Sequence, residues 1–296
     1  MTDIAVQNTA CIGAGVIGHS WATLFALHNL NVVLQDLSQV ILDRAIEQIT
    51  CNLNILITKS VIRPTQASEA LRKIRTTTNL KDAVNKAEYI QESVFENYAL
   101  KQEIYQAIDA TTAQDAIIAS SSSMLLMTEI QKGLQYPERC IVAHPYNPPH
   151  LMPLVEVVPG QDTVGHTTQQ TVRLMQYLGR TPLVIRKEAY GYIGNRLQRG
   201  VFQEANDLVN SGVAGIHDID QAMALGPGLR WAIYGPYLVR YFNTPSHLYQ
   251  PTYEMVEKGY DSYPLLQGHS FKEMVQWRDG KLIDLLRVLG HMSPAE

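Results

Sequence analysis

The feature that most constrains the fold is a glycine-rich turn near the start of the chain. Gly13, Gly15 and Gly18 form G-x-G-x-x-G, which follows the apolar run Thr9–Ile12 and opens an apolar stretch at helical spacing, Val16–Leu27. In such a strand–turn–helix unit the first glycine permits a tight turn, the second lets the backbone approach a pyrophosphate, and the third lets the helix pack close to the sheet. The exposed amides and the helix dipole stabilise phosphate charge. The pattern therefore predicts a dinucleotide-binding unit.

The next apolar run, Asn31–Gln35, ends at an acidic residue, Asp36. A carboxylate at this place accepts hydrogen bonds from both ribose hydroxyls and repels the additional phosphate of NADP. No arginine follows Asp36 immediately, so the sequence favours NAD. The alternative, a glycine turn beside an unrelated surface aspartate, is disfavoured because strand, glycines, helix, strand and aspartate occur in the expected order.

Residues 1–186 alternate short apolar runs with helical stretches, and residues 187–296 do not. The further apolar runs are Tyr89–Ser93, Ala116–Ser120, Cys140–His144, Leu154–Val158 and Leu183–Ile185. This alternation predicts an α/β fold, a Rossmann-type doubly wound, mainly parallel sheet. Downstream of a boundary near Arg186–Glu188, helical spacing dominates from Ile193 to Asn210 and from Phe271 to Leu289. We expect a second, all-helical domain over residues 187–296.

Composition excludes several other classes of protein. Charged residues make up 18% of the chain and the net charge is -4, so no concentrated basic face for nucleic acid is expected. No apolar run approaches the roughly 18 residues of a membrane span, and the N-terminus lacks a signal-peptide layout. Cys11, Cys51 and Cys140 show no metal-ligand or disulfide spacing, so we expect buried, inert thiols, no metal and a cytoplasmic protein.

Three polar features interrupt the apolar runs of the first domain. A serine run, Ser120–Ser123, follows one run; His144 ends another; and Glu156 lies inside a third, LMPLVEVV. Ligands of open α/β sheets bind at the carboxyl ends of strands, so the serine and the histidine can share one cleft. A glutamate flanked by apolar residues is costly to bury without a partner, and His144 is the candidate partner. Such a pair orients the imidazole and raises its basicity for acid–base catalysis.

Each of these features also has a structural explanation when taken singly. A serine run after a strand is typical of a turn or a helix cap. His144, before a proline, can be a structural hydrogen bonder, and Glu156 can bind a backbone amide at a sheet end. The combination with a dinucleotide-binding unit is what favours a catalytic site.

With these residues in place, the chain resembles the 3-hydroxyacyl-CoA dehydrogenases and, more closely, their lambda-crystallin/L-gulonate 3-dehydrogenase and L-carnitine dehydrogenase relatives. The matching stretches extend from residue 13 to about residue 236, and they are GAGVIGHSWATLFA, ESVFENYALKQEIY, ASSSS, AHPYNPPHLMPLVEVVPG, GYIGNRLQRGVFQEANDLVNSGV and GPGLRWAIYGP. The resemblance implies a nucleotide-binding domain, a helical domain that forms a homodimer, and oxidation of a 3-hydroxy group with NAD.

The resemblance also implies roles for individual residues. His144 matches the catalytic histidine and Glu156 its carboxylate partner, while Ser123 and Asn195 match the residues that hydrogen-bond the reacting oxygen. Glu96 and Lys101 match positions near the nicotinamide. The predicted cofactor-binding set is Gly13, Gly15, Val16, Ile17, Gly18, Asp36, Glu96, Lys101 and Ser121.

The sequence departs from the family pattern in two places. The family often has Asn-Thr-Ser-Ser where this chain has Ser121–Ser122–Ser123–Met124, so Ser122 is an alternative working hydroxyl to Ser123. The residue before Asn195 is usually apolar, whereas here it is Gly194, which predicts a looser backbone beside Asn195.

The segment GPGLRWAIYGP bears on the substrate. Arg230 lies in an apolar, glycine-rich setting beside Trp231, and both are predicted to bind substrate, with the guanidinium on a carboxylate. The alternative is an arginine stacked on Trp231 or paired with a carboxylate of its own domain. The motif resembles the gulonate and carnitine branch and suggests a small free 3-hydroxy acid. Nearby aromatic residues suit either a trimethylammonium cage or a packed helix face; they are Trp231, Tyr234, Tyr237, Tyr241 and Phe242.

Two other functions remain open at this point. A 3-hydroxyacyl-CoA dehydrogenase needs a basic patch for the CoA phosphates, and the charges from Lys59 to Arg75 either supply it or are solvated helix faces. A crystallin-like structural protein would keep the fold without activity, and the intact Ser123, His144, Glu156 and Asn195 set argues against it. The sequence leaves the substrate, its stereochemistry and the physiological direction open.

Overall fold

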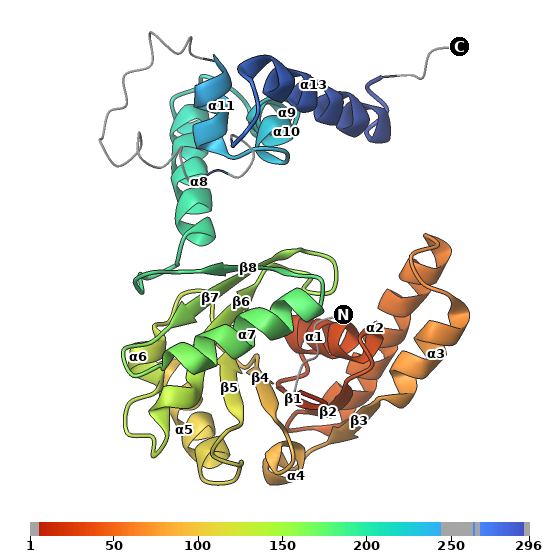
Figure 1. Ribbon diagram of the computed structural model, residues 1–296, viewed down its shortest axis with the longest axis vertical. Helices are drawn as coiled ribbons and strands as arrows, with labels where there is room; N and C mark the ends of the chain where they lie inside the picture. The colour runs from red at the N-terminus through yellow and green to blue at the C-terminus, as the bar shows by residue number, and fades with distance from the viewer. Residues whose placement is uncertain (1–5, 244–262, 264–266, 293–296) are drawn as a thin grey trace. The chain divides into compact units, whose positions relative to one another are not determined.

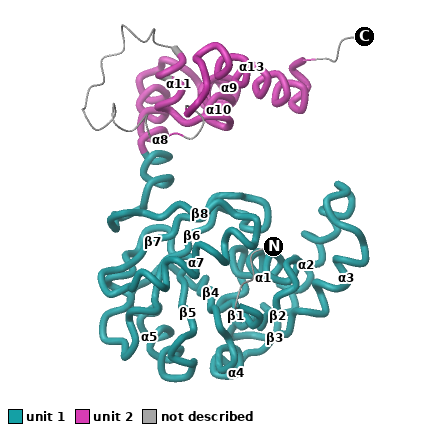
Figure 2. The backbone as a smooth tube through the Cα atoms, viewed as in Figure 1, with its two compact units in different colours: residues 1–199 teal, residues 200–296 magenta. Residues whose placement is uncertain are grey.

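The computed structural model describes residues 6–243, 263 and 267–292. It divides into two compact units, residues 1–199 and residues 200–296 (Figure 2). The division lies inside helix α8 (Gly194–Asn210), downstream of the boundary expected at Arg186–Glu188. The start of α8 stays with the first unit because the backbone N–H of Gly194 donates to the side chain of Glu156.

A single eight-stranded sheet forms the centre of the first unit (Figure 1). Its strand order is β3-β2-β1-β4-β5-β6-β7-β8, and every neighbouring pair is parallel except β6 and β7. The strands are β1 (Asn8–Ile12), β2 (Asn31–Gln35), β3 (Ile74–Thr77), β4 (Tyr89–Glu92), β5 (Ile117–Ser120), β6 (Cys140–Pro145), β7 (Leu154–Pro159) and β8 (Thr181–Val184). The order reverses between β1 and β4, the point at which open α/β sheets bind ligands.

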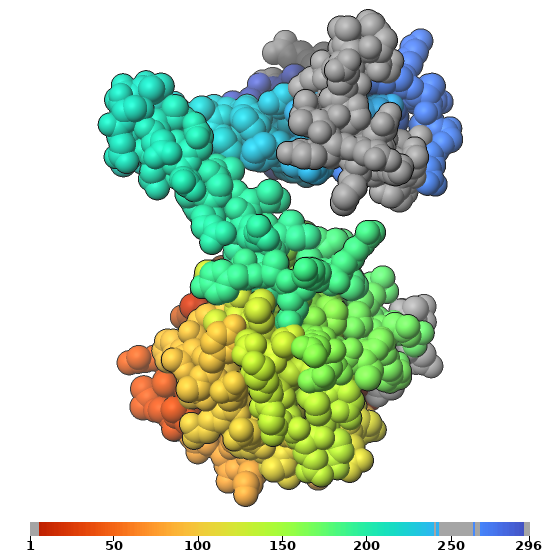
Figure 3. Space-filling model, turned by 90° about the vertical axis from the view of Figure 1, so that its left-hand side faces the viewer, coloured from red at the N-terminus to blue at the C-terminus, as the bar shows by residue number. Residues whose placement is uncertain are grey.

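Helices cover both faces of this sheet (Figure 1). Alternate strand residues point to opposite faces, so Cys11 packs in one core while Ala10 and Ile12 pack in the other. The first core is closed by α1 (Val16–Leu27), α2 (Gln39–Thr58), α3 (Pro64–Arg72) and α7 (Gly165–Tyr177). The second is closed by α4 (Leu80–Val84), α5 (Tyr98–Asp109) and α6 (Met127–Ile130). In the side view of Figure 3, the yellow to green surface of the first unit belongs to residues of the segment from α5 to α7. The predicted Rossmann-type fold is confirmed.

The second unit is helical where it is described. Besides most of α8 it contains α9 (Ile216–Leu225), α10 (Pro227–Trp231), α11 (Pro236–Asn243) and α13 (Phe271–Val288). Its small core is formed by Tyr234, Leu238, Phe242 and Met274. The expected all-helical character is therefore found among the described residues of this unit.

Two local expectations were wrong. Strand β3 was not predicted, because Ile74–Thr77 reads Ile-Arg-Thr-Thr and, as one of the two edge strands, needs no apolar run. Cys51 was expected to be buried, but it is exposed on α2, whereas Cys11 and Cys140 are buried. None of the helices in the described part of the chain is long and apolar enough to cross a membrane.

Candidate active site

The glycine-rich turn joins β1 to α1 with the geometry that its spacing predicts. Gly13 has a φ of 90°, and a Cβ on it would lie 2.7 Å from the backbone oxygen of Ser93. A Cβ on Gly18 would lie 1.7 Å from the oxygen of Gly13, so only glycine lets α1 start this close to the strand end. A Cβ on Gly15, by contrast, would meet no atom within 4 Å. The backbone at Gly15 is thus open to a pyrophosphate at the helix N-terminus.

Asp36 binds back to the glycine turn. Its Oδ2 accepts a hydrogen bond of 2.7 Å from the N–H of Ala14, and its Oδ1 accepts one of 2.7 Å from the N–H of Leu37. Each carboxylate oxygen has a second lone pair, so the side chain can still accept from ribose hydroxyls. Leu37 beside it is 90% exposed, and Phe95, after β4, is 85% exposed. Apolar side chains left this open at the carboxyl edge of the sheet suit a ligand that covers them.

His144 and Glu156 lie directly opposite each other on the antiparallel strands β6 and β7. The imidazole Nδ1 is 2.8 Å from Glu156 Oε2, and because a carboxylate only accepts, Nδ1 carries the proton and donates it. Both side chains are buried, Glu156 completely. Within the described part of the chain, Nε2 has no hydrogen-bond partner. The arrangement fixes the tautomer that leaves Nε2 free to accept a proton.

The second oxygen of Glu156 is also occupied. Oε1 accepts hydrogen bonds from the N–H groups of Ile193 and Gly194, at 3.0 and 3.1 Å. Burial acts to raise the pKa of Glu156, but the hydrogen bonds from His144, Gly194 and Ile193 outweigh it and the pKa is lowered. Glu156 therefore stays a carboxylate that can stabilise a protonated imidazole.

The serine loop after β5 is organised by Glu96. Its Oε1 accepts from the Oγ of Ser122 at 2.8 Å and from the N–H groups of Ser123 and Met124 at 2.8 and 3.0 Å. Ser122 is buried and also accepts from the N–H of Leu125, so its hydroxyl holds the turn. Ser123 is only half-buried, and its Oγ makes a longer contact of 3.3 Å to Glu96. Of the two candidate hydroxyls, Ser123 is therefore the more accessible to a substrate.

Beneath Glu96 lies a fully buried ion pair that the sequence reasoning missed. Lys101 Nζ is 2.6 Å from Glu92 Oε1 and 3.6 Å from Glu96 Oε2. Glu92 also accepts from Ser120 Oγ, at 2.6 Å. Lys101 is 1% exposed, so this structure places it behind Glu96 rather than on an open surface. Glu92 has the same signal that singled out Glu156, a carboxylate among apolar strand residues.

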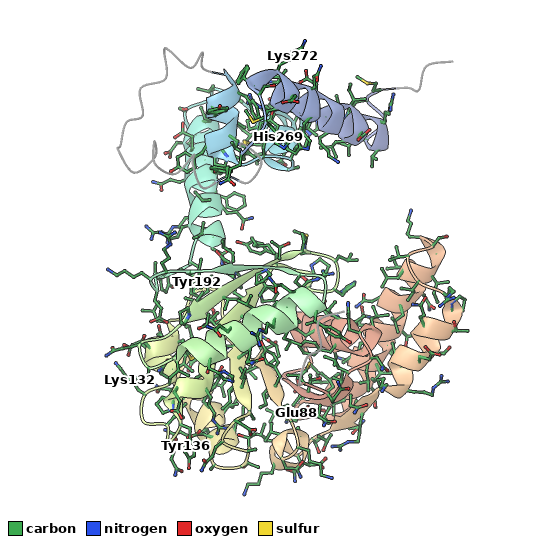
Figure 4. The ribbon with its side chains drawn as sticks, in the orientation of Figure 1. Glu88, Lys132, Tyr136, Tyr192, His269 and Lys272 are labelled. Carbon is green, nitrogen blue, oxygen red and sulfur yellow. The ribbon has the colours of Figure 1, made fainter. Side chains whose placement is uncertain are left out.

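The start of α8 completes the cluster. Asn195 Nδ2 donates to the backbone oxygen of Ser123 at 3.1 Å, which brings these two predicted residues together. The backbone at Gly194 is not loosened as expected, since its N–H is bound to Glu156. Tyr192, labelled in Figure 4, has a φ of 47° and donates from its hydroxyl to the oxygen of Leu125. Non-glycine residues in this left-handed region are uncommon and concentrate at functional sites.

Ser121 lies in a hydrogen-bond network between α1, β4 and the serine loop. Its Oγ accepts from Trp21 Nε1 at 3.2 Å and from Gln91 Nε2 at 2.8 Å, and it is 2.9 Å from Ser93 Oγ. Gln91 is fully buried and also donates to the backbone oxygen of Ala143, next to His144. Ser121 thus links the cofactor helix to the strand that bears the histidine.

Arg230 and Trp231 belong to α10 of the second unit. Arg230 is half-buried and has no acidic partner among the residues described, and Trp231 is 40% exposed. Of the five neighbouring aromatic residues, Tyr234 and Phe242 are buried in the core of this unit, with their rings 5.4 Å apart. The packed-face interpretation holds for these two, which are not available for a trimethylammonium cage.

The chain is similar to known dehydrogenases over most of its length. The profile of the 3-hydroxyacyl-CoA dehydrogenase NAD-binding domain matches residues 8–189, and that of the family's C-terminal domain matches residues 191–279. Lambda-crystallin of Oryctolagus cuniculus is 33% identical over 99% of this chain and 100% of its own length. L-carnitine dehydrogenase of Pseudomonas aeruginosa is 37% identical over 79% of this chain and 71% of its own. The crystal structure of (S)-3-hydroxybutyryl-CoA dehydrogenase from Ralstonia eutropha superposes with a TM-score of 0.71 at 29% identity, over 76% of this chain and 78% of that one.

The fold and the matches to both family domains define an NAD-dependent dehydrogenase that acts on a CH–OH group. More narrowly, the chain belongs to the 3-hydroxyacyl-CoA dehydrogenase family. Its predicted cofactor, NAD, is confirmed by the match to the NAD-binding domain.

Proposed function

We propose that this protein interconverts a 3-hydroxy group and a ketone on a small carboxylic acid, of the L-gulonate or carnitine kind, with His144 as the proton-transferring residue. The observation that supports this most is the buried pair of His144 and Glu156, joined by a 2.8 Å hydrogen bond that leaves Nε2 free. General acid–base help from such a group is typically worth about 10²–10⁴-fold in rate.

In the oxidising direction, His144 Nε2 accepts the hydroxyl proton of the substrate, and Glu156 stabilises the imidazolium that forms. Ser123 Oγ and Asn195 Nδ2 donate to the reacting oxygen, on which charge develops, which is preorganised electrostatic stabilisation. Asn195 is already held beside Ser123 by its bond to the Ser123 backbone oxygen. In the reducing direction, protonated His144 returns the proton.

NAD, when bound, supplies the hydride acceptor for the reacting carbon. The residues that would hold it are those of the glycine turn, with Gly15 open toward the pyrophosphate, and Asp36 at the ribose. We assign Val16 and Ile17 to the same turn, and Glu96 and Ser121 to the nicotinamide end. Lys101 contributes through Glu96, because it is itself buried.

For the substrate, we retain the sequence-based assignment of Arg230 to the carboxylate, with Trp231 beside it. The alternative acyl-CoA substrate needs unpaired basic groups for its phosphates. Within the candidate basic region, Arg75 is 2.6 Å from Asp82 and Lys73 donates to Asn31. Arg75 is thereby taken up by a carboxylate, and the preference for the free acid over the CoA ester rests on the assignment of Arg230.

We also propose a homodimer formed through the helical part of the chain. No residue of α8 is buried, and Leu197 and Phe202 are 59% and 64% exposed. Apolar side chains of this size on one helix suit a subunit interface. A cytoplasmic location remains a prediction, and light scattering of the purified protein measures the dimer directly.

The test of the function is turnover with NAD and a panel of 3-hydroxy acids, carnitine and 3-hydroxybutyryl-CoA, with the matching ketones assayed with NADH. We expect the free acids to be the better substrates. His144→Ala should remove most turnover, by about 10²–10⁴-fold, while NADH binding measured by fluorescence stays unchanged. NADH binding without turnover of any compound would favour a non-enzymatic, crystallin-like protein, and near-normal turnover by His144→Ala would refute the assignment.

A further inference from the structure

Tyr146 lies beside the catalytic pair, in space that Gly194 leaves open. It is two residues beyond His144, and the two ring centroids are 5.3 Å apart at an interplanar angle of 49°. A Cβ on Gly194 would lie 1.4 Å from Tyr146 Oη and 2.6 Å from Cζ. The phenol therefore occupies the place that any other residue at 194 would fill.

Tyr146 Oη is buried, and no donor or acceptor in the part of the chain that the structure describes bonds to it. Burial, and after it the charge of Glu156, raise the pKa of Tyr146 to about 12, so the group is a neutral phenol that can donate. Buried hydroxyls without a partner are uncommon and destabilise the folded state. One that lies beside an active-site histidine is explained if the bound substrate supplies the missing partner.

We propose that Tyr146 is a specificity-determining residue whose hydroxyl donates a hydrogen bond to a second oxygen of the substrate, on a carbon next to the reacting one. The proposal rests on the function proposed above, because His144 Nε2 must meet the reacting hydroxyl for its neighbour Tyr146 to meet the adjacent carbon. Through this hydrogen bond, Tyr146 selects 3-hydroxy acids that carry a further hydroxyl on the carbon next to the reacting one over acids without that hydroxyl.

The kinetic test uses two acids that differ by that one oxygen, 2,3-dihydroxybutanoate and 3-hydroxybutanoate, with NAD. We expect the wild-type enzyme to prefer the dihydroxy acid in kcat/KM, and Tyr146→Phe to lose about tenfold on it while staying within about twofold on the other. Tyr177→Phe is the matched control, since its hydroxyl donates to the backbone oxygen of His28, away from the site. It should leave both values unchanged. A Tyr146→Phe variant that loses activity equally on both acids, or on neither, overturns the proposal.

Thermal unfolding of the protein without ligands tests the premise separately from activity. Because Tyr146 Oη has no partner among the described residues, Tyr146→Phe should keep or raise Tm. Tyr177→Phe should lower Tm by a few degrees through the loss of a hydrogen bond of 3.0 Å. A decrease in Tm for Tyr146→Phe as large as that of the control would show that the hydroxyl is paired in the free protein and would overturn the inference. A wild-type enzyme inactive on every 3-hydroxy acid would instead overturn the proposed function, and this inference with it.

Discussion

Glu156→Gln is the substitution that tests the catalytic pair most directly, because it keeps the shape of the side chain and removes its charge. The carboxylate accepts three hydrogen bonds, from His144 Nδ1 at 2.8 Å and from the N–H groups of Ile193 and Gly194 at 3.0 and 3.1 Å. A glutamine has one acceptor oxygen and one donor NH₂ group. With its oxygen toward the backbone, the NH₂ faces Nδ1, which must then accept, and the imidazole proton moves to Nε2. A protonated, neutral Nε2 cannot take the substrate proton.

The opposite orientation of the glutamine is no better. With its oxygen toward His144, the NH₂ group meets two backbone donors, which leaves buried N–H groups unpaired at about 1–3 kcal/mol. The comparable replacement of aspartate by asparagine behind the histidine of a serine protease lowers kcat by about 10⁴. We therefore expect kcat of Glu156→Gln to fall by about 10³–10⁴-fold. NADH affinity should change by less than about twofold, since the glycine turn and Asp36 follow β1 and β2, away from β6 and β7.

The assay is initial-rate NADH formation at saturating substrate, with NADH binding and Tm measured on the same preparation. Glu88→Gln is the matched control. Glu88, labelled in Figure 4, also accepts with Oε2 from two backbone N–H groups, those of Gln7 and Asn8 at 2.6 and 2.8 Å. It is exposed, and no histidine among the described residues bonds to it. It should retain wild-type kcat. A Glu156→Gln enzyme within about tenfold of wild type would refute the tautomer argument, as would an equal loss in Glu88→Gln.

Three further predictions concern the cofactor, the buried ion pair and acid stability. Asp36→Ala should raise the KM for NAD by about tenfold or more and narrow its preference over NADP, measured by kinetics with both cofactors; an unchanged preference would contradict the ribose assignment. Lys101→Met leaves Glu92 buried without its cation, which should lower the free energy of unfolding by about 3–5 kcal/mol and Tm by on the order of 10 °C. Lys132→Met, which breaks an exposed ion pair, should barely change Tm. The pKa of Glu156 is lower in the folded than in the unfolded protein, so its carboxylate stabilises the fold. This contribution is complete above the unfolded-state pKa of about 4.3 and is lost as the pH falls below it. In urea unfolding, the free energy of unfolding should therefore fall less between about pH 5 and about pH 3 for Glu156→Gln than for wild type. Equal decreases in the two proteins would show that the pair does not contribute to acid destabilisation.

The parts of the fold that could be predicted are those set by local sequence. A buried parallel strand needs an unbroken apolar run, and the run Asn31–Gln35 became β2 with the same bounds. Helix α1 likewise begins and ends where its spacing indicates. Strand β3 was missed because an edge strand is only half-covered and tolerates arginine and threonine. Cys51 was misjudged because its position on the outer side of α2 depends on how the helix packs.

In the site, Glu156 could be predicted because a buried carboxylate needs a partner, and the structure pairs it with His144. The same argument applied to Glu92 would have found the second buried carboxylate and its partner Lys101. Sequence could not show that Gly194 makes room for Tyr146, since this fit joins a hairpin to a helix far along the chain. Complementarity of that kind depends on tertiary packing. The role of Gly194 becomes clear only when the side chain that packs against it, that of Tyr146, is known.

The reversal of chain direction at β7 explains why this sheet can build a histidine–carboxylate pair at its ligand-binding edge. Residues close in sequence cannot face each other on parallel strands, because a crossover must intervene. The antiparallel pairing of β6 with β7 removes that limit and sets His144 opposite Glu156 at the carboxyl end of β6. The backbone that enters α8 then supplies the two N–H groups that complete the carboxylate. The pair is thus buried and oriented by a strand register that His144→Ala leaves in place, so that substitution tests chemistry separately from folding. Glu156→Gln also changes the acceptor of the Ile193 and Gly194 N–H groups, which is why Tm is measured beside kcat.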